Sequence, residues 1–394
     1  MYDVTIIGAG PAGSRLACRL AEYGYQVVVI EKKKDLSEPV CCTGIVSSEC
    51  IRDFSIPDTI IYREANGATL YSPSGKILHI KRPEPQAYII DRAALNVFLS
   101  ERAIETGVEY IFGRHVVRIK RKPDRVILEA DLEKTKPMLL ESRVVVIATG
   151  FGVTLTEQVD LKKVDNYAIG VQAEVETNGV EEVEVFTGKS IAPGFFAWLV
   201  PTLRGRSLAG LISRRRTAYY MKNFLSLLTE RRKIIPGNYD LCFAGLALNM
   251  LSRTSSERVL VVGSAAGQVK PATGGGVYYG MICADIAADS LHRALESDNL
   301  TAGSLALYDR QWKKVLGREI RLGYWGRTFF ERLNDNRIDK IFDIITSSDI
   351  DKTLLENDDI KFDLHGSIIL KLIRHEALSR TFKAVNLPFP LRKR

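Results

Sequence analysis

Residues 2–31 read YDVTIIGAGPAGSRLACRLAEYGYQVVVIE, and this stretch decides the fold. The apolar, β-branched run at 2–7 predicts a buried strand, and residues 14–23 predict a helix with one apolar face. Gly24 is typical of a helix C-terminus, and residues 26–30 predict a second buried strand. Strand, helix and strand within about 30 residues form a βαβ unit. The chain is therefore expected to be an α/β protein built on a Rossmann-like parallel sheet.

The turn between the first strand and the helix carries the spacing Gly8-x-Gly10-x-x-Gly13. In this setting the first glycine allows the tight turn, the second lets backbone approach a pyrophosphate, and the third allows close helix packing. Glu31 ends the second strand, 18 residues after Gly13, where a carboxylate accepts hydrogen bonds from ribose hydroxyls. An acidic residue there disfavours a 2′-phosphate, so FAD or NAD is expected rather than NADP.

Three later segments favour FAD over NAD. Asp91-Arg92 opens a helix, Ala148-Thr149-Gly150 ends a strand, and the strand at 259–262 leads into a glycine-rich segment that reaches Gly276. Ligands of open α/β sheets bind at the carboxyl ends of strands. Strand ends so far apart in the sequence, gathered at one face, predict a long and extended dinucleotide.

The remaining pattern predicts an FAD-binding domain that is interrupted by an antiparallel-sheet substrate domain and followed by a helical C-terminal region. We expect the FAD-binding domain to comprise residues 1–60, 88–165 and 253–330. The substrate domain is expected at 61–87 and 166–252, where strand-like alternation and the turn Ser72-Pro73-Ser74-Gly75 indicate a hairpin and further strands. The helical C-terminal region is expected at residues 331–394.

Composition bounds the protein class. The 394 residues are 46% hydrophobic and 26% charged, as in ordinary globular proteins, and no stretch is apolar enough to span a bilayer. With no signal sequence before the first strand, a cytoplasmic location is expected. The net charge of +8 comes without a nucleic-acid motif, so it suits anionic lipid headgroups or acidic partners, or simply aids solubility. The tail at 386–394 is apolar and then basic; a solvated, frayed terminus is the favoured interpretation, and peripheral membrane contact is the alternative.

The six cysteines fit no zinc or iron–sulfur spacing and are expected to be free thiols, while the five histidines are scattered. No metal site is therefore predicted.

Three motifs outside the dinucleotide turn carry a family resemblance. They are PVCCTGIVS at 39–47, SIAPGFFAWLVP at 190–201 and GSAAGQVKPATGGGV at 263–277. Together with the N-terminus, they resemble the geranylgeranyl reductase family of flavoproteins, whose fold is like that of p-hydroxybenzoate hydroxylase. The resemblance extends from Tyr2 to about Arg327. It implies an FAD-dependent oxidoreductase that reduces carbon–carbon double bonds of isoprenoid lipids.

The resemblance also assigns residues to the cofactor. Those expected to bind FAD are Gly8, Gly10, Ala12, Gly13, Glu31, Lys32, Cys42, Thr43, Gly44, Arg92, Val116, Gly150, Ser264, Gly274, Gly275, Gly276 and Val277. Among them Ala12, Gly13 and Glu31 would hold the ADP half. Cys42, Thr43 and Val277 would approach the flavin ring.

Ser264 departs from the family pattern, which has aspartate in this position to hydrogen-bond the ribityl chain. Serine keeps a hydroxyl but loses a charge-assisted bond of about 1.5–3 kcal/mol, against about 1 kcal/mol for a neutral one. Weaker FAD binding, or a divergent paralogue, is therefore expected.

Reduced flavin delivers hydride from N5 to an alkene carbon, and the other carbon then needs a proton. The expected catalytic residues are Cys42, near the ring, and Gly275, whose backbone N–H would stabilise negative charge on the reduced flavin. A small cysteine that merely packs the loop is the alternative for Cys42. Phe195, Phe196, Trp198 and Pro201 are expected to line the substrate cavity, the alternative being ordinary core.

No second Gly-x-Gly-x-x-Gly follows a strand, so a separate NAD(P)H domain is not expected. The electron donor is either NAD(P)H bound transiently or ferredoxin, whose acidic surface would suit a basic chain. Two other functions stay open: a flavin monooxygenase or halogenase of the same fold, and an inactive flavin- or lipid-binding paralogue. The sequence does not set the oligomeric state.

Overall fold

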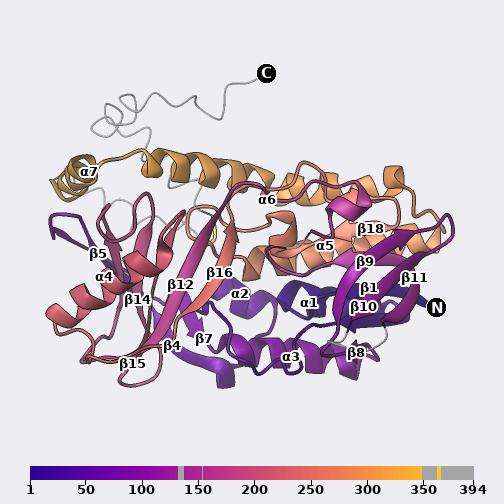
Figure 1. Ribbon diagram of the computed structural model, residues 1–394, viewed down its shortest axis with the longest axis horizontal. Helices are drawn as coiled ribbons and strands as arrows, with labels where there is room; N and C mark the ends of the chain where they lie inside the picture. The colour runs from indigo at the N-terminus through magenta and orange to yellow at the C-terminus, as the bar shows by residue number, and fades with distance from the viewer. Residues whose placement is uncertain (132–136, 153, 348–361, 365–394) are drawn as a thin grey trace.

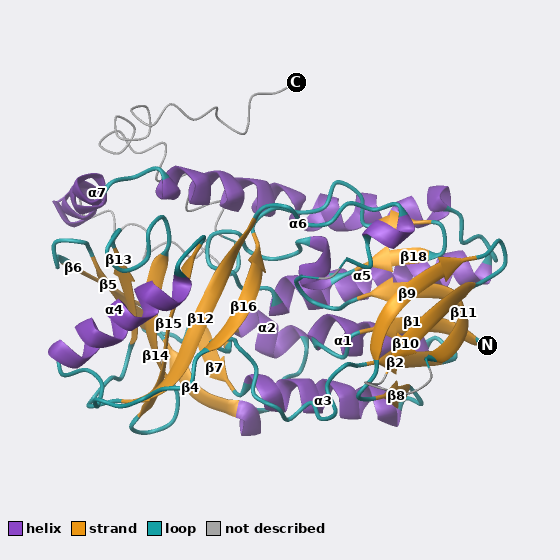
Figure 2. Cartoon of the chain, viewed as in Figure 1, coloured by secondary structure: helices purple, strands orange, loops and turns teal. Residues whose placement is uncertain are grey.

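The protein is described by a computed structural model that covers residues 1–131, 137–152, 154–347 and 362–364. Its described part is elongated, with one large sheet toward each end and helices packed between and along them (Figure 1). The colouring by secondary structure separates the two sheets clearly (Figure 2).

An eight-stranded sheet is built around the N-terminal strand. β1 (Tyr2–Ile7) lies between β2 (Val27–Ile30) and β11 (Met138–Ile147), and both pairings are parallel. The hydrogen-bonded order is β17-β18-β11-β1-β2-β8, and β10 and β9 extend the sheet antiparallel from β11. The added strands are β8 (Glu109–Ile111), β9 (His115–Arg121), β10 (Val126–Asp131), β17 (Ser255–Ser256) and β18 (Val259–Val261).

Helices bury one face of this sheet. α1 (Pro11–Glu22) packs between α3 (Arg92–Glu105) and α5 (Val277–Glu296), and α6 (Ala302–Glu331) packs on α5. The apolar face of α1 contributes Leu16 and Leu20, both fully buried, to a core that also holds Trp312 of α6. Burial of side chains this large stabilises the βαβ unit by roughly 1.5–3 kcal/mol each. That packing fixes the loop at residues 8–13 above the carboxyl end of β1.

The second large sheet has seven strands in the order β16-β12-β15-β14-β13-β5-β6. They are β5 (Gly67–Tyr71), β6 (Ile77–Lys81), β12 (Tyr167–Glu176), β13 (Val183–Thr187), β14 (Phe196–Pro201), β15 (Arg206–Ser213) and β16 (Cys242–Ala247). Neighbours are antiparallel except β13 and β5, which run parallel. α4 (Thr217–Glu230) covers β15 and β12.

A three-stranded sheet and short helices join the two halves. Its strands are β3 (Ile45–Ser47), β7 (Ala87–Ile90) and β4 (Ile61–Ala65), in that order. α2 (Ser48–Asp53) follows β3, and α7 (Asp335–Ser347) packs on β6 through a cluster that includes Leu78 and Phe342. The described residues also form three short 3₁₀ helices: η1 (Asp58–Ile60), η2 (Glu157–Val159) and η3 (Gly263–Ala266).

The expected fold class is confirmed: a Rossmann-like sheet, a second and largely antiparallel sheet, and helices toward the C-terminus. The parallel pairing of β13 with β5 was not expected, and neither were α2 and α4. The domain boundaries stay a proposal; β4, within 61–87, pairs with β7 rather than with the large antiparallel sheet. The tail at 386–394 lies outside the described residues. No helix among the described residues is both long and apolar enough to cross a membrane.

Candidate functional site

One continuous cavity of about 1060 Å³ runs from the carboxyl ends of β1 and β2 to the inner face of the seven-stranded sheet. At one end it touches the glycine turn and Glu31, and at the other it touches Phe196 and Trp198. Pockets for drug-sized ligands usually measure about 300–1,000 Å³. The cavity is therefore large enough for an extended ligand together with part of a second molecule.

The glycine turn has the geometry that its spacing predicts. Gly8 has φ +108°, and a Cβ there would lie 2.6 Å from the Ala148 carbonyl oxygen. A Cβ on Gly13 would lie 1.9 Å from the Gly8 carbonyl oxygen, so the helix packs on the turn only because residue 13 is glycine. Gly10 has no heavy atom within 4 Å of its would-be Cβ and borders the cavity. Because Gly10 caps α1 without a side-chain bond, N–H groups at this helix end are available to an anion.

Glu31 is held in place by backbone. Its Oε2 accepts a hydrogen bond from the Ala9 N–H at 2.8 Å, and its Oε1 accepts one from the Lys33 N–H at 2.9 Å. The Glu31 side chain is buried yet borders the cavity. The buried Val116 and the exposed Lys32 border it too. Each carboxylate oxygen has a further lone pair, which leaves acceptor capacity for a ribose.

The middle of the cavity contains buried polar atoms that have no hydrogen-bond partner among the described residues. They are Arg92 Nε, Thr149 Oγ1 and Gln172 Oε1, and all three residues border the cavity. Buried polar atoms are nearly always hydrogen-bonded, so such atoms along one cavity indicate a polar ligand. Together with the open helix end and Glu31, they fit a dinucleotide that continues toward Gly150 and Ser264.

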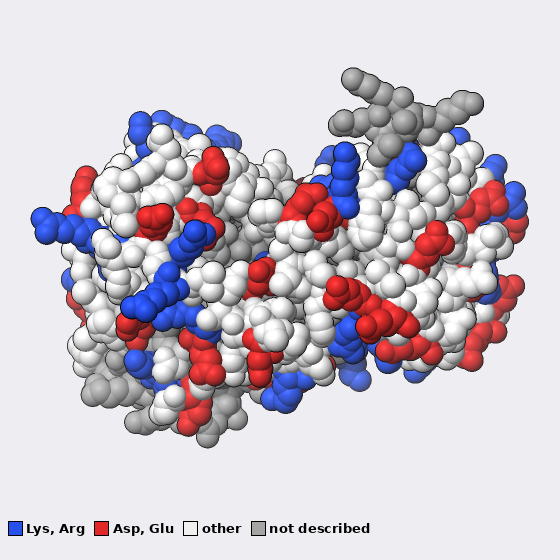
Figure 3. Space-filling model, turned by 90° about the horizontal axis from the view of Figure 1, so that it is seen from below, with Lys and Arg blue, Asp and Glu red and all other residues white. Residues whose placement is uncertain are grey.

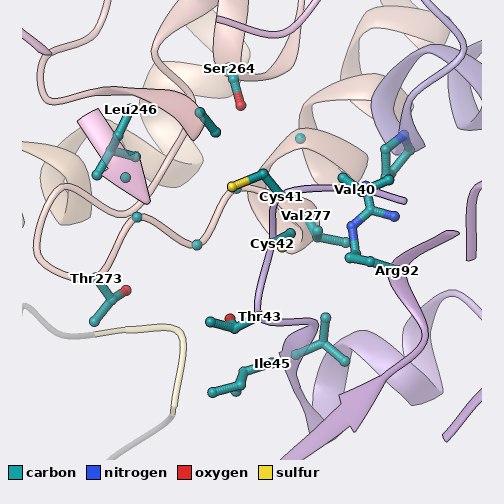
Figure 4. Close-up of a pocket in the computed structure, with 18 of the residues that line it drawn as sticks. Val40, Cys41, Cys42, Thr43, Ile45, Arg92, Leu246, Ser264, Thr273 and Val277 are labelled. Atoms are coloured by element: carbon teal, nitrogen blue, oxygen red, sulfur yellow. The ribbon is translucent and has the colours of Figure 1, made fainter. Parts of the chain in front are cut away.

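The opposite wall brings together the cysteine loop (residues 39–47) and the glycine-rich loop (residues 263–277) (Figure 4). Cys42, Thr43, Ser264 and Val277 all border the cavity, together with Gly274, Gly275 and Gly276. A Cβ on Gly276 would lie 3.2 Å from Ser264 Oγ, which places the serine hydroxyl against the loop backbone.

The cysteine loop is tied to the seven-stranded sheet. The Gln172 side-chain amide of β12 donates to the Cys42 carbonyl at 3.3 Å. All six cysteines are free thiols. A hydrogen bond between Cys41 and Cys242 raises the pKa of Cys41 and lowers the pKa of Cys242 to about 7.

The far end of the cavity is apolar. Phe196 and Trp198 of β14 border it, and Trp198 Nε1 is buried without a partner among the described residues. Most other bordering side chains at this end are aliphatic or aromatic: Leu70, Leu78, Ile80, Val183, Val185, Val200, Ile212, Ile345 and Phe362. The polar side chains of Asn66, Arg82 and Gln86, at the ends of β5, β6 and β7, also border the cavity. The apolar part of the wall suits a hydrocarbon chain.

Four of the predicted residues do not border the cavity. Gly13 packs on Gly8, and Gly44 lies so close to β7 that a Cβ would come 2.2 Å from the Ile90 carbonyl oxygen. Phe195 is buried beneath the Arg327 guanidinium, 4.0 Å from its ring, and Pro201 ends β14 opposite Ser207. Phe195 and Pro201, which were expected to line the substrate cavity, therefore lie behind its wall rather than along it.

Several cavity residues were not singled out from the sequence. They are Gln172, Leu246, Lys270 and Asp363, with the aliphatic side chains of β5, β6 and β13. Lys270 lies within a motif that had been recognised, so its charge inside an otherwise small-residue loop was a usable signal. Asp363 has no such signal, because nothing in the sequence around it indicates that this part of the chain borders the cavity.

Comparisons with known proteins agree with this arrangement. Residues 2–179 match a family model described as pyridine nucleotide-disulphide oxidoreductase. A digeranylgeranylglycerophospholipid reductase of Methanocaldococcus jannaschii is 28% identical over 88% of this chain and 91% of its own. A geranylgeranyl bacteriochlorophyll reductase-like protein of Thermoplasma acidophilum superposes with a TM-score of 0.84 at 22% identity, covering 97% of this chain and 98% of the other. A p-nitrophenol 4-monooxygenase of Pseudomonas putida shares the fold, with a TM-score of 0.68 at 16% identity over 90% and 96%.

Fold, cavity and relatives define the class: the chain is a flavoprotein oxidoreductase that uses FAD. Within that class it is a distant relative of the geranylgeranyl reductases, at about 27–28% identity over most of its length.

Proposed function

We propose that this protein reduces carbon–carbon double bonds of geranylgeranyl or related isoprenoid lipids. The observation that carries the proposal is the single cavity, whose dinucleotide end opens directly into an apolar end. A hydrocarbon chain in the apolar end would reach the flavin ring within the same cavity. The relatives named for digeranylgeranylglycerophospholipid reduction support the same substrate class.

FAD, when bound and reduced, supplies a hydride to the alkene. For the cofactor we assign Gly8, Gly10, Ala12, Glu31 and Lys32 to the ADP half, supported by Gly13. We assign Arg92 and Val116 to the diphosphate and adenine side, and Gly150 and Ser264 to the middle of the cavity. The ring end would be formed by Cys42, Thr43, Gly274, Gly275, Gly276 and Val277, with Gly44 fixing the cysteine loop. All but Gly13 and Gly44 border the cavity, which supports the assignment.

The chain's own residues would orient the alkene and exclude water. Phe196 and Trp198 would hold the lipid against the ring, and the Gly275 backbone N–H would stabilise negative charge that develops there. An isolated prenyl double bond is not polarised, so both the position of the alkene and the source of a proton are decisive.

The electron donor belongs to the same proposal, either NAD(P)H or ferredoxin. The net charge of +8 suits an acidic protein donor, although acidic and basic side chains alternate over the face shown in Figure 3. A lipid substrate also requires contact with a membrane surface, and we place the protein at the cytoplasmic face.

The test begins with the purified protein and added FAD. After anaerobic photoreduction, the protein is mixed with a geranylgeranyl lipid or with its fully saturated counterpart. We expect reoxidation of the flavin by the unsaturated lipid alone, with one double bond lost per flavin. Reoxidation by oxygen together with hydroxylated or halogenated product would instead establish a monooxygenase or halogenase. Failure to bind FAD would establish a cofactor-free paralogue.

A further inference from the structure

A buried ion pair borders the cavity where the glycine-rich loop meets the C-terminal region. Lys270 Nζ and Asp363 Oδ1 are 2.5 Å apart, and the residues are 6% and 3% exposed. Both residues border the cavity. They are 93 positions apart in the sequence, so the C-terminal region completes a wall that the glycine-rich loop begins.

The local structure aims Lys270 at this position. The Lys270 N–H donates to the Gly275 carbonyl at 2.9 Å, and the Gly274 N–H donates to the Lys270 carbonyl at 2.8 Å. The side chain then runs across Gly275, where a Cβ would lie 2.5 Å from Lys270 Cε. Glycine at position 275 is thus what allows the ammonium group to reach the cavity wall.

The partner aspartate is fixed just as firmly. The Tyr279 hydroxyl of α5 donates to the Asp363 carbonyl at 2.8 Å, and the Phe362 ring lies 4.8 Å from Lys270 Nζ. Asp363 Oδ2 is buried and has no hydrogen-bond partner among the described residues. The cost of removing charges from water usually cancels the attraction within a buried pair, so stability does not explain its position.

Other ionisable groups along the cavity are less suited to deliver a proton near the ring. Glu31 and Lys32 border the dinucleotide end. The Tyr278 hydroxyl donates to Asp53 at 2.8 Å, and burial and that bond raise the pKa of Tyr278. The pKa of Cys41 is raised by its hydrogen bond with Cys242 and by burial. His115 lies at the dinucleotide end, next to Arg114, whose N–H donates to the Glu31 carbonyl. Cys42 borders the ring end and is the competing donor, with a single thiol proton. Lys270 has three N–H donors and is held by a buried carboxylate, so we prefer it.

We propose that Lys270 is the proton donor of the reduction and that Asp363 is the residue that positions it. The inference rests on the proposed function. The alkene π bond breaks, one carbon receives the hydride that reduced flavin supplies, and the other receives a proton from Lys270 Nζ. The electron pair of the broken N–H bond stays on the nitrogen. Asp363 orients Nζ, and water returns the proton.

The main test uses Lys270→Ala and Lys270→Arg in full-length protein that has been loaded with FAD and photoreduced. Arginine keeps the positive charge beside Asp363, but it does not give up its proton in proteins. We expect reoxidation by the unsaturated lipid to be about 10²–10⁴-fold slower in both variants, the usual range for general acid catalysis. Methylammonium should restore part of the rate to Lys270→Ala, whereas tetramethylammonium, which has no proton to give, should not.

Asp363 is tested by Asp363→Asn and Asp363→Glu. The amide should slow lipid-dependent reoxidation by about tenfold, and glutamate should recover most of the loss. Hydrogen–deuterium exchange of residues 362–364 in the FAD-free protein gives a readout that is independent of activity. Exchange there should rise in Lys270→Ala and stay low in Lys270→Arg.

Lys76→Met is the matched control. Lys76 Nζ pairs with Asp343 at 2.6 Å, so this exposed pair also ties the C-terminal region to a sheet, but away from the main cavity. Its rates should equal those of the wild type.

The outcomes separate the two proposals. Failure of the wild-type protein to be reoxidised by any unsaturated lipid would overturn the proposed function. A responsive wild type with an equally fast Lys270→Arg would overturn the role of Lys270 alone. So would a slow Lys270→Ala that methylammonium does not rescue.

Discussion

At the scale of single residues, Gly10 and Gly13 stand three positions apart in the same turn but carry different constraints. A Cβ at position 13 would collide with the Gly8 carbonyl, whereas a Cβ at position 10 would meet no atom of the protein. Gly10 also has φ −72°, which alanine adopts without strain. Gly13 is therefore required by the fold, whereas Gly10 is required only by a ligand that approaches the backbone.

This difference predicts opposite results for two alanine variants. Gly13→Ala should lower the melting temperature of the FAD-free protein by several degrees. Gly10→Ala should leave that temperature unchanged and raise the Kd for FAD at least tenfold, because the methyl group occupies the path of the diphosphate. Thermal melts of the apoprotein and titration with FAD measure the two effects separately. Wild-type affinity in Gly10→Ala would show that the diphosphate does not bind at this turn.

Ser264 tests the ribityl end of the same cavity. Replacing the serine hydroxyl by a carboxylate should add a charge-assisted hydrogen bond worth roughly 1 kcal/mol more than the neutral one. We therefore expect Ser264→Asp to lower the Kd for FAD about threefold to tenfold, and Ser264→Ala to raise it. Flavin fluorescence titration decides the point. Equal Kd values in all three proteins would mean that residue 264 does not touch FAD.

At the scale of elements, α3 depends on Asp91 as its N-cap. Asp91 Oδ1 accepts from the Ala93 and Ala94 N–H groups, each at 2.9 Å, and Oδ2 accepts from the Tyr62 hydroxyl at 2.7 Å. Burial alone would raise the pKa of Asp91, but these hydrogen bonds outweigh it, and the pKa is lowered. The cap also fixes the next residue, Arg92, at the cavity wall.

A lowered folded-state pKa makes the charge of Asp91 stabilising above its unfolded pKa of about 3.9, and this gain is lost as the pH falls through the folded value. Asp91→Ala should cost about 0.5–2 kcal/mol of unfolding free energy at pH 7. Asp91→Asn, which caps without charge, should cost less, and its deficit should shrink as the pH falls below about 4. Urea unfolding at several pH values measures both. A deficit for Asp91→Asn that does not change with pH would contradict the argument.

The elements that sequence predicted best are those with strong local signals. β1, α1 and β2 follow from apolar runs and glycine punctuation, and α3 follows from its cap. The sequence did not predict α4. The helix contains the aromatic residues Tyr219, Tyr220 and Phe224, which also suit strands, and arginines flank it on both sides. β16, with three small residues in CFAGLA, forms a strand because β12 pairs with it, and such pairing leaves no periodic pattern.

At the scale of the whole molecule, the site could be predicted only where its parts are close in sequence or carry a motif. The glycine turn, Glu31 and the glycine-rich loop were found in this way. Gln172 and Asp363 could not be found, because each reaches the cavity through tertiary packing of a segment that has no signature. The parallel pairing of β13 with β5 has the same origin, since it joins strands more than 100 residues apart.

A contact between distant parts of the chain also holds the seven-stranded sheet against α6. Glu331, the last residue of α6, accepts hydrogen bonds from Arg214 after β15, at 2.5 Å to Oε1 and 3.1 Å to Oε2. It also pairs with Arg327, one turn earlier in α6. Arg327 is only 4% exposed, it donates to the Gly194 carbonyl at 3.2 Å, and burial lowers its pKa to about 10. One carboxylate therefore neutralises a buried guanidinium and ties the segment before β14 to the helix.

Removing that carboxylate should affect the cavity wall at β14 more than the end of the cavity at the glycine turn. Glu331→Ala leaves Arg327 buried without its partner, a change that typically costs about 3–5 kcal/mol. The exposed pair of Glu182 with Lys81 gives the control, because Glu182→Ala should cost less than about 1 kcal/mol. Hydrogen–deuterium exchange should rise at residues 190–201 in Glu331→Ala, while the Kd for FAD changes less than threefold. A uniform rise in exchange across both sheets would instead mean that the two halves unfold as one cooperative unit, and that Glu331 supports the fold as a whole rather than the wall at β14.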